Sequence, residues 1–153
     1  MQSASAETGS ILSEAEAVAA LDGIYKGDYR AAFLDKNPDL FLRHIPDDFQ
    51  SIAVDGSRFD AAALRAVFPQ QFRTIVRTLE HHVTIDNLQV GVDGTVSTIV
   101  TLYTLIERHG VDERTYFVTT IGTYRDEWQK RGGMWFQVRG DQLHNQVITD
   151  SRA

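Results

Sequence analysis

Two carboxylates and one imidazole have the types and settings that acid–base chemistry needs. Asp28 interrupts an apolar helical stripe formed with Leu21, Tyr25 and Ala32. Burial beside such neighbours disfavours the charged form of a carboxyl group, so Asp28 is a candidate general base. His44 follows the apolar side of a short helical segment and is a second catalytic candidate. The competing interpretations are a solvated helix edge for Asp28 and a hydrogen-bonded packing residue for His44.

Asp126 is the third catalytic candidate, because it alternates along one strand with three residues that can line a pocket. Tyr116, Thr120 and Tyr124 share its predicted face. These three are predicted ligand-binding residues, and Tyr116 and Tyr124, like Tyr25 and Tyr29 on the first helix, are also candidate proton donors. The competing interpretation is an exposed aspartate near the end of a hairpin.

Metal and cofactor chemistry has little support in the sequence. His81 and His82 are adjacent in a predicted strand and therefore point to opposite faces, so we predict no metal site, although either could act singly as a base. The chain has no cysteine, which excludes thiolate nucleophiles and cysteine-based clusters. It also lacks a phosphate-binding loop, a dinucleotide fingerprint and a nucleophile elbow, and we predict no cofactor.

Length and charge restrict the organisation and the partners. A chain of 153 residues with 42% hydrophobic residues fits one domain, which we place at 13–150 after a disordered tail at 1–12. The net charge of −6 makes nucleic acid an unfavourable partner, and no apolar run is long enough to span a membrane. The first ten residues do not resemble a signal peptide but fit a processed terminus equally well, so the compartment stays open between cytoplasmic and exported.

Hydrophobic periodicity predicts helices followed by long strands. A capping box at Ser13 and Glu16 begins a helix that runs to about Asp35, and a short helix spans 37–45. A small hairpin turns at Asp55-Gly56 and leads to a third helix from Asp60, which Pro69 should kink or interrupt before Phe72, Ile75 and Val76. Stretches 78–90, 95–107, 115–130 and 134–148 are rich in β-branched and aromatic residues and are joined by short turns. This order predicts an α+β fold with an antiparallel meander.

The ordered motifs resemble the nuclear transport factor 2-like (NTF2-like) superfamily, particularly its SnoaL-like single-domain members. The resemblance rests on Asn37-Pro38-Asp39-Leu40-Phe41, on Pro46-Asp47-Asp48-Phe49, on Val54-Asp55-Gly56 and on the segment from Trp128 to Trp135, and it covers about 13–147. It implies a cone, also called the cystatin-like fold, in which three helices cover a strongly bent antiparallel sheet around an apolar cavity. By similarity to the association domain of calcium/calmodulin-dependent protein kinase II, the Asp126 face points inward.

The resemblance leaves the function open, because this fold serves many activities. Our first interpretation is a cavity for a small apolar or amphipathic molecule, with acid–base chemistry of the isomerase, dehydratase or cyclase kind. The base position of the related ketosteroid isomerase falls near Ala53, which cannot take a proton. The alternative is a non-catalytic homodimerisation or ligand-sensing module whose cavity is filled by phenylalanines. An empty cavity of roughly 300 Å³ or more with converging polar groups would favour ligand binding.

The resemblance also indicates wall residues and a partner. The remaining predicted ligand-binding residues are Tyr25, Tyr29, Phe33, Phe41 and Phe136. We expect a homodimer formed through the outer face of the sheet, with Trp135, Gln137, Arg139 and Asp141 as its mixed contact surface.

Overall fold

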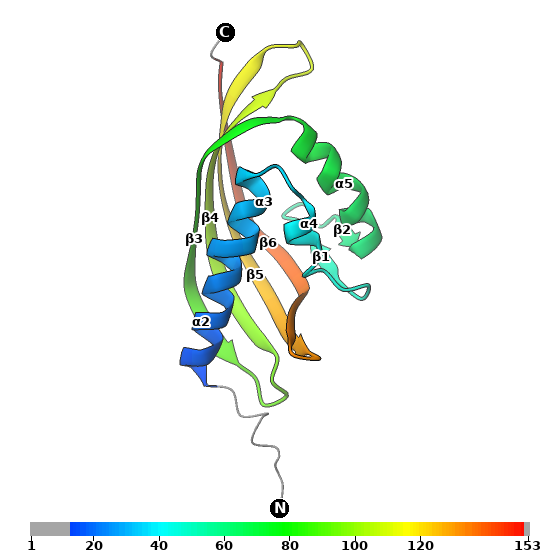
Figure 1. Cartoon of the computed structure of the whole chain (residues 1–153), viewed down its shortest axis with the longest axis vertical. Helices are drawn as coiled ribbons and strands as arrows, with labels where there is room; N and C mark the ends of the chain where they lie inside the picture. Colours follow the sequence, from blue (N-terminus) through cyan, green and yellow to red (C-terminus); the bar gives the residue numbers. More distant parts are fainter. Residues whose placement is uncertain (1–12, 152–153) are drawn as a thin grey trace, which may run out of the picture.

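The computed structural model describes residues 13–151, so the tail predicted at 1–12 lies outside the described residues. The described chain has the predicted α+β layout of helices, a small hairpin, another helix and four long strands (Figure 1). No helix of the described residues is long and apolar enough to cross a membrane. The helical elements are α2 (Glu14–Ile24), η1 (Tyr25–Tyr29), α3 (Arg30–Leu34), α4 (Asp39–Leu42) and α5 (Ala61–Arg73), and the strands are β1 (Gln50–Ile52), β2 (Arg58–Asp60), β3 (Ile75–Val90), β4 (Val96–His109), β5 (Thr115–Arg131) and β6 (Met134–Ser151).

One six-stranded sheet carries the whole fold, in the order β2-β1-β6-β5-β4-β3. The four long strands form the predicted antiparallel meander, whereas β1 pairs with β6 in parallel, so the sheet is mixed. The strands twist strongly, and α2, η1 and α3 run along one face of the sheet (Figure 1). Ala17, Leu21 and Tyr25 from this helical segment pack on Val100 and Trp128, which are equally buried. The sheet is thus covered on one face, as predicted.

The first helix follows its predicted course but contains an unpredicted π-helical turn. Its start carries the complete capping box of Ser13 and Glu16. Between Tyr25 and Tyr29 the backbone widens into η1, and it returns to α-helix at Arg30. Such π-helical turns occur frequently at functional sites. Here the turn contains both buried tyrosines, Tyr25 and Tyr29.

One local prediction about the third helix is wrong. The helix α5 continues through Pro69 to Arg73, so of the predicted kink or interruption at Pro69 the interruption does not occur. Ile75 and Val76, which were predicted to follow in the helix, belong to strand β3 instead. Their β-branched side chains favour extended backbone, and helix α5 ends at Arg73 with Thr74 as its C-cap, directly before them.

A bulge at Val138 reverses the predicted orientation of the first part of β6. Trp128 pairs with Gln137 and Glu127 pairs with Arg139, so Val138 is an extra residue without a partner on β5. Gln137 is buried and faces the helices, while its neighbour Phe136 lies on the opposite face. The prediction that Gln137 belongs to the outer contact surface and Phe136 to the interior is therefore wrong.

Candidate functional site

A cavity of about 230 Å³ lies between the helices and the covered face of the sheet. Its wall is mainly aromatic and aliphatic, and it contains no lysine or arginine. The volume is below the 300 Å³ set above for ligand binding, so only a small molecule fits, but polar groups do converge on the space. The lining residues are Tyr25, Tyr29, Phe33, Phe41, Phe49, Ser51, Leu64, Phe68, His81, Val83, Val100, Leu102, Tyr124, Asp126, Gln137 and Gly140.

Asp126 lies in the cavity wall at the centre of a buried hydrogen-bond network. Its Oδ2 accepts a hydrogen bond of 2.6 Å from the Tyr25 hydroxyl. The Tyr25 oxygen in turn accepts a hydrogen bond from Trp128 Nε1 at 3.0 Å and lies 3.0 Å from Thr98 Oγ1. Because the single proton of Tyr25 goes to Asp126, the hydroxyl of Thr98 must be the donor to Tyr25. This network fixes the orientation of Asp126.

The burial of Asp126 makes it a weak acid that titrates near neutral pH. Burial is the main cause that raises the pKa of its carboxyl group from 3.8 to about 7. The hydrogen bond from Tyr25 lowers the pKa of Asp126, and the negative charge of Asp141 raises it. Since Oδ2 already accepts from Tyr25, the acidic proton belongs on Oδ1, which has no hydrogen-bond partner among the described residues. In its acid form Asp126 is therefore a free hydrogen-bond donor.

His81 is the second ionisable group in the cavity wall, and its pKa is shifted in the opposite direction. Its side chain is buried on β3, and Nδ1 has no hydrogen-bond partner in the part of the chain that the structure describes. Burial lowers the pKa of His81 from 6.5 to about 4, and the positive charge of Arg30 lowers it further. Between pH 4 and 7 the cavity thus contains a protonated carboxyl group and a neutral imidazole, the reverse of their usual order of titration.

Tyr29 and Gln137 form a second polar pair in the wall. The Tyr29 hydroxyl donates to Gln137 Oε1 at 2.6 Å, and Gln137 Nε2 faces the Arg139 carbonyl at 3.4 Å. With the amide reversed, Oε1 would face the carbonyl oxygen of Arg139 and two acceptors would oppose each other. The pair therefore holds the amide nitrogen in a defined direction.

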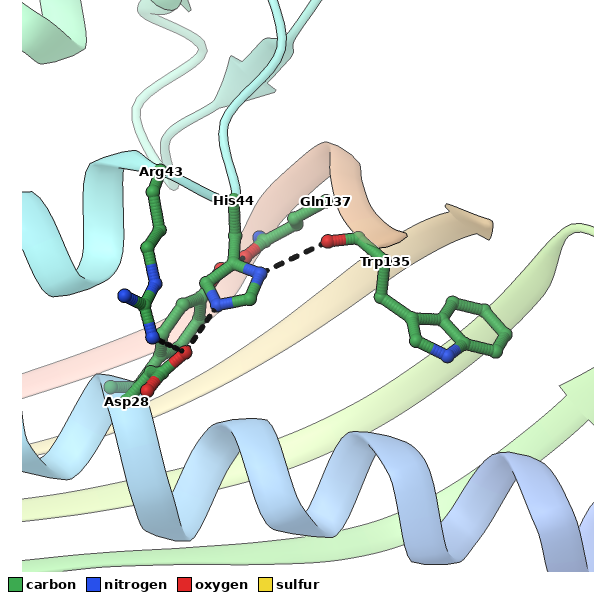
Figure 2. Close-up of polar contacts among 6 residues, drawn as sticks. Asp28, Arg43, His44, Trp135 and Gln137 are labelled. Carbon is green, nitrogen blue, oxygen red and sulfur yellow. Dashed lines mark hydrogen bonds and ion pairs between the residues drawn. The ribbon is translucent and has the colours of Figure 1, made fainter. Parts of the chain in front are cut away.

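Asp28 and His44 bind each other and lie outside the residues that line the cavity (Figure 2). His44 Nε2 is 2.7 Å from Asp28 Oδ2, which also accepts from Arg43 at 2.7 Å, and His44 Nδ1 is 3.0 Å from the Trp135 carbonyl. Burial would raise the pKa of Asp28, but the hydrogen bonds from Arg43 and His44 outweigh it and keep the pKa below 3.8. The cluster connects η1, the end of α4 and the start of β6, so its role is to hold these three segments together.

The structure brings together most, but not all, of the predicted site residues. The predicted residues that line the cavity are Asp126, Tyr25, Tyr29, Phe33, Phe41 and Tyr124. The predicted residues that lie outside its lining are Tyr116, Thr120, Phe136, Asp28 and His44.

Distance and strand orientation explain which predicted residues fall outside the cavity. Tyr116 shares the face of Asp126 but lies ten residues away along a strand, roughly 30 Å, and its hydroxyl donates to Asp112 in the hairpin turn. Thr120 lies between them, beyond the cavity, and Phe136 is on the other face. Among the described residues no cluster of three His, Asp or Glu side chains has the geometry of a metal site.

Sequence reasoning missed Gln137 as a wall residue and named His81 only as one of two possible bases. For His81 a signal was available, since Val83 and Ile85 follow at strand spacing and mark its face as apolar. For Gln137 none was available, because the bulge at Val138 sets its direction.

Comparisons of sequence find no relative, whereas comparisons of structure find many. No protein-family model matches the sequence, and no curated protein matches it significantly. The fold is similar to the crystal structure of LinA, with a TM-score of 0.62 and 15% identity over 90% of each chain. It is also similar to a protein assigned as a scytalone dehydratase from Novosphingobium aromaticivorans, with a TM-score of 0.64 and 17% identity over 89% of this chain and 87% of that chain. The comparison with an NTF2-like protein from Cytophaga hutchinsonii gives a TM-score of 0.61 and 17% identity, over 86% of this chain and 98% of that chain.

These likenesses identify the fold. The chain has the α+β fold of the NTF2-like superfamily, also described as cystatin-like, as the sequence motifs predicted. At identities of 10–17% they define the architecture and leave the activity to be argued from the cavity itself.

Proposed function

We propose that this protein is an acid–base enzyme that moves a proton on a small, largely apolar molecule, in a reaction of the isomerase or dehydratase kind. Asp126 is the general acid and His81 the general base. The observation that supports this most directly is their presence in one apolar cavity with pKa values shifted in opposite directions. Such a pair supplies a proton and accepts one at the same pH.

The environment of each group suits its role. A protonated Asp126 donates from Oδ1, and the hydrogen bond from Tyr25 prevents the carboxyl group from turning away. Neutral His81 has a buried Nδ1 with no hydrogen-bond partner among the described residues, and a buried polar atom of this kind favours contact with a hydrogen-bonding group. The similarity to a protein assigned as a scytalone dehydratase agrees with this class of reaction, and so does the crystal structure described as a hexachlorocyclohexane dehydrochlorinase. A cyclisation reaction would use the same acid, Asp126, and the same base, His81.

The proposal is tested by proton exchange, which needs no knowledge of the natural substrate. The protein is incubated in D₂O with a panel of small cyclic ketones, and replacement of C–H by C–D is followed by ¹H NMR. We expect exchange that is fastest between pH 4 and 7, because Asp126 is protonated below about 7 and His81 is neutral above about 4.

The variants Asp126→Asn and His81→Asn should each lower this exchange by roughly 10²–10⁴-fold. Asp35→Asn, at an exposed position, serves as the control for the loss of one negative charge. Exchange that persists unchanged in both cavity variants would remove the proposed catalytic pair and leave a binding function for the cavity.

We also propose that two copies associate through the sheet face opposite the helices. This face carries the half-buried apolar side chains of Ile99, Tyr103, Leu105 and Ile121, and Tyr103 pairs directly with Ile121. Isolated apolar side chains are normal on a surface, but a contiguous set on a sheet favours a protein contact. We propose these four apolar residues in place of the contact surface that was predicted around Trp135 and Gln137, because Gln137 is buried and faces the helices.

Light scattering after size exclusion tests the pairing. We expect twice the monomer mass for the wild-type protein and the monomer mass for Ile121→Glu. Val54→Glu makes a similar change at an exposed position of the small hairpin and should leave the mass unchanged. A monomeric wild-type protein would exclude the homodimer.

A further inference from the structure

A second hollow lies outside the cavity, at the end of the molecule where α3 and α5 both stop (Figure 1). Its volume is about 350 Å³, which exceeds the roughly 300 Å³ set above for ligand binding. It shares no lining residue with the cavity and is therefore a separate space. We call it the α3–α5 cleft, and its lining residues are Lys36, Pro38, Pro69, Phe72, Arg73 and Ile75.

The floor of the α3–α5 cleft is apolar and rigid. Phe72 is buried, and the rings of Pro38 and Pro69, which also line the cleft, are half-buried. Phe33 and Phe68, which line the cavity, support the Phe72 ring at centroid distances of 4.9 Å and 5.5 Å. This layer of aromatic rings separates the cleft from the cavity. Proline rings have a fixed shape and pack well on flat aromatic groups, so the floor suits an aromatic ring.

The rim of the cleft is positively charged, although the protein has a net charge of −6. Lys36 and Arg73 are exposed, and neither has an ion pair or a side-chain hydrogen bond among the described residues. No acidic residue lines the cleft. In the part of the chain that the structure describes, the lysines and arginines that do pair with a carboxylate are Lys26, Arg43, Arg65, Arg77, Arg131 and Arg139.

The usual role of a basic residue at a helix end is already filled by Arg108. A cation near the C-terminal end of a helix stabilises the carbonyl groups that have no partner within the helix. Arg108 pairs with Ile75 across the sheet and donates to the Gln71 carbonyl at 3.0 Å and to the Thr74 hydroxyl at 2.7 Å. Arg73 is therefore left without this task, and Arg108 adds a third positive charge beside the cleft.

We propose that the α3–α5 cleft binds a small aromatic acid, with its carboxylate between Lys36 and Arg73 and its ring on the two prolines and Phe72. The guanidinium group of Arg73 can donate two parallel hydrogen bonds to a carboxylate, and the ammonium group of Lys36 attracts the same oxygens as a point charge. This inference goes beyond the proposed function, because it assigns a second site and a second class of ligand.

The two hollows select ligands of opposite charge character. No lysine or arginine lines the cavity, so a carboxylate that entered it would lose its hydration without gaining a cation. The α3–α5 cleft offers two cations above an apolar floor, so a carboxylate there gains partners while its ring leaves water. An aromatic acid should therefore bind in the cleft and leave the cavity free.

The experiment uses 2-naphthoate as the probe and follows its binding by ¹H–¹⁵N NMR at neutral pH and low salt. We expect the largest shifts at the backbone amides of Lys36, Arg73 and Ile75, and an affinity that falls as sodium chloride is added. The uncharged analogue 2-naphthylmethanol keeps the ring and loses the carboxylate, so it should bind about tenfold more weakly or less.

Lys36→Gln and Arg73→Gln should each weaken binding of 2-naphthoate by about threefold to tenfold. Arg58→Gln, which removes one positive charge at an exposed position of β2, is the matched control and should leave the affinity unchanged. The unchanged remainder of each NMR spectrum establishes that the variants are folded. Shifts confined to cavity residues such as Val83 and Val100, or equal affinity in the wild type and both cleft variants, would overturn the site.

The outcomes separate this inference from the proposed function. His81→Asn lies in the cavity wall, so it should bind 2-naphthoate as the wild type does. Lys36→Gln and Arg73→Gln should in turn keep the proton exchange that requires His81. A protein that shows this exchange but does not bind 2-naphthoate would retain the proposed function and lose the cleft as a ligand site, and the reverse result would retain only the cleft.

Discussion

The Asp126→Asn variant is expected to gain stability relative to the wild-type protein as the pH rises from 4 to 7, while His81→Asn is expected to lose it. The pKa of Asp126 is raised from 3.8 to about 7, so in this range the folded protein binds more protons than the unfolded chain. Stability from this group is present below pH 3.8 and is lost as the pH rises through 7. Replacing Asp126 removes that loss.

The sign for His81 is opposite. Its pKa is lowered from 6.5 to about 4, so between these values the unfolded chain binds more protons than the folded protein. Stability from His81 therefore increases as the pH rises from 4 to 6.5, and His81→Asn forgoes this increase. In the wild-type protein the two effects largely cancel, which hides both groups from a simple pH scan.

Urea unfolding followed by tryptophan fluorescence at a series of pH values measures the difference. Across the range we expect a relative gain on the order of 4 kcal/mol for Asp126→Asn and a relative loss on the order of 3 kcal/mol for His81→Asn. Asp35→Asn should run parallel to the wild type. Curves of the same sign for the two cavity variants would mean that the two groups do not have the environments described above.

The order of the elements could be predicted from the sequence because it depends on local signals. The capping box at Ser13 and the turn at Asp55-Gly56 determine their structure over a few residues, and long β-branched stretches separated by glycine turns leave few alternatives to a meander. The inward direction of Tyr124 and Asp126 likewise follows from strict alternation on β5, which has no extra residue there.

The rest of the site depends on contacts between distant residues. A single extra residue, Val138, reverses the faces of Gln137 and Phe136, and no local property of β6 reveals it. The pairing of Asp28 with His44 joins two helical segments 16 residues apart, so each looked like an isolated catalytic group in the sequence.

The Tyr25→Phe variant is the second change with a large expected effect. It removes one oxygen atom from a fully buried network and leaves Asp126 Oδ2, Trp128 Nε1 and the Thr98 hydroxyl without their common partner. Buried polar groups that lose a partner cost about 1–3 kcal/mol each, so we expect a loss of roughly 3 kcal/mol in the free energy of unfolding. Trp128 reports the change directly through its fluorescence.

Tyr124→Phe is the matched control, since it removes the same atom from the same cavity. Among the described residues, the hydroxyl of Tyr124 accepts one long hydrogen bond of 3.5 Å from Gln142 Nε2, so its loss should cost less than about 1 kcal/mol. The two variants also differ in their expected effect on Asp126. Loss of the Tyr25 hydrogen bond raises the pKa of Asp126 further, because that bond favours the ionised carboxylate. Tyr25→Phe should therefore shift the decrease of proton exchange at alkaline pH to higher pH, whereas Tyr124→Phe should leave it unchanged. If this decrease occurs at the same pH in the two variants, Tyr25 does not influence Asp126 as the general acid.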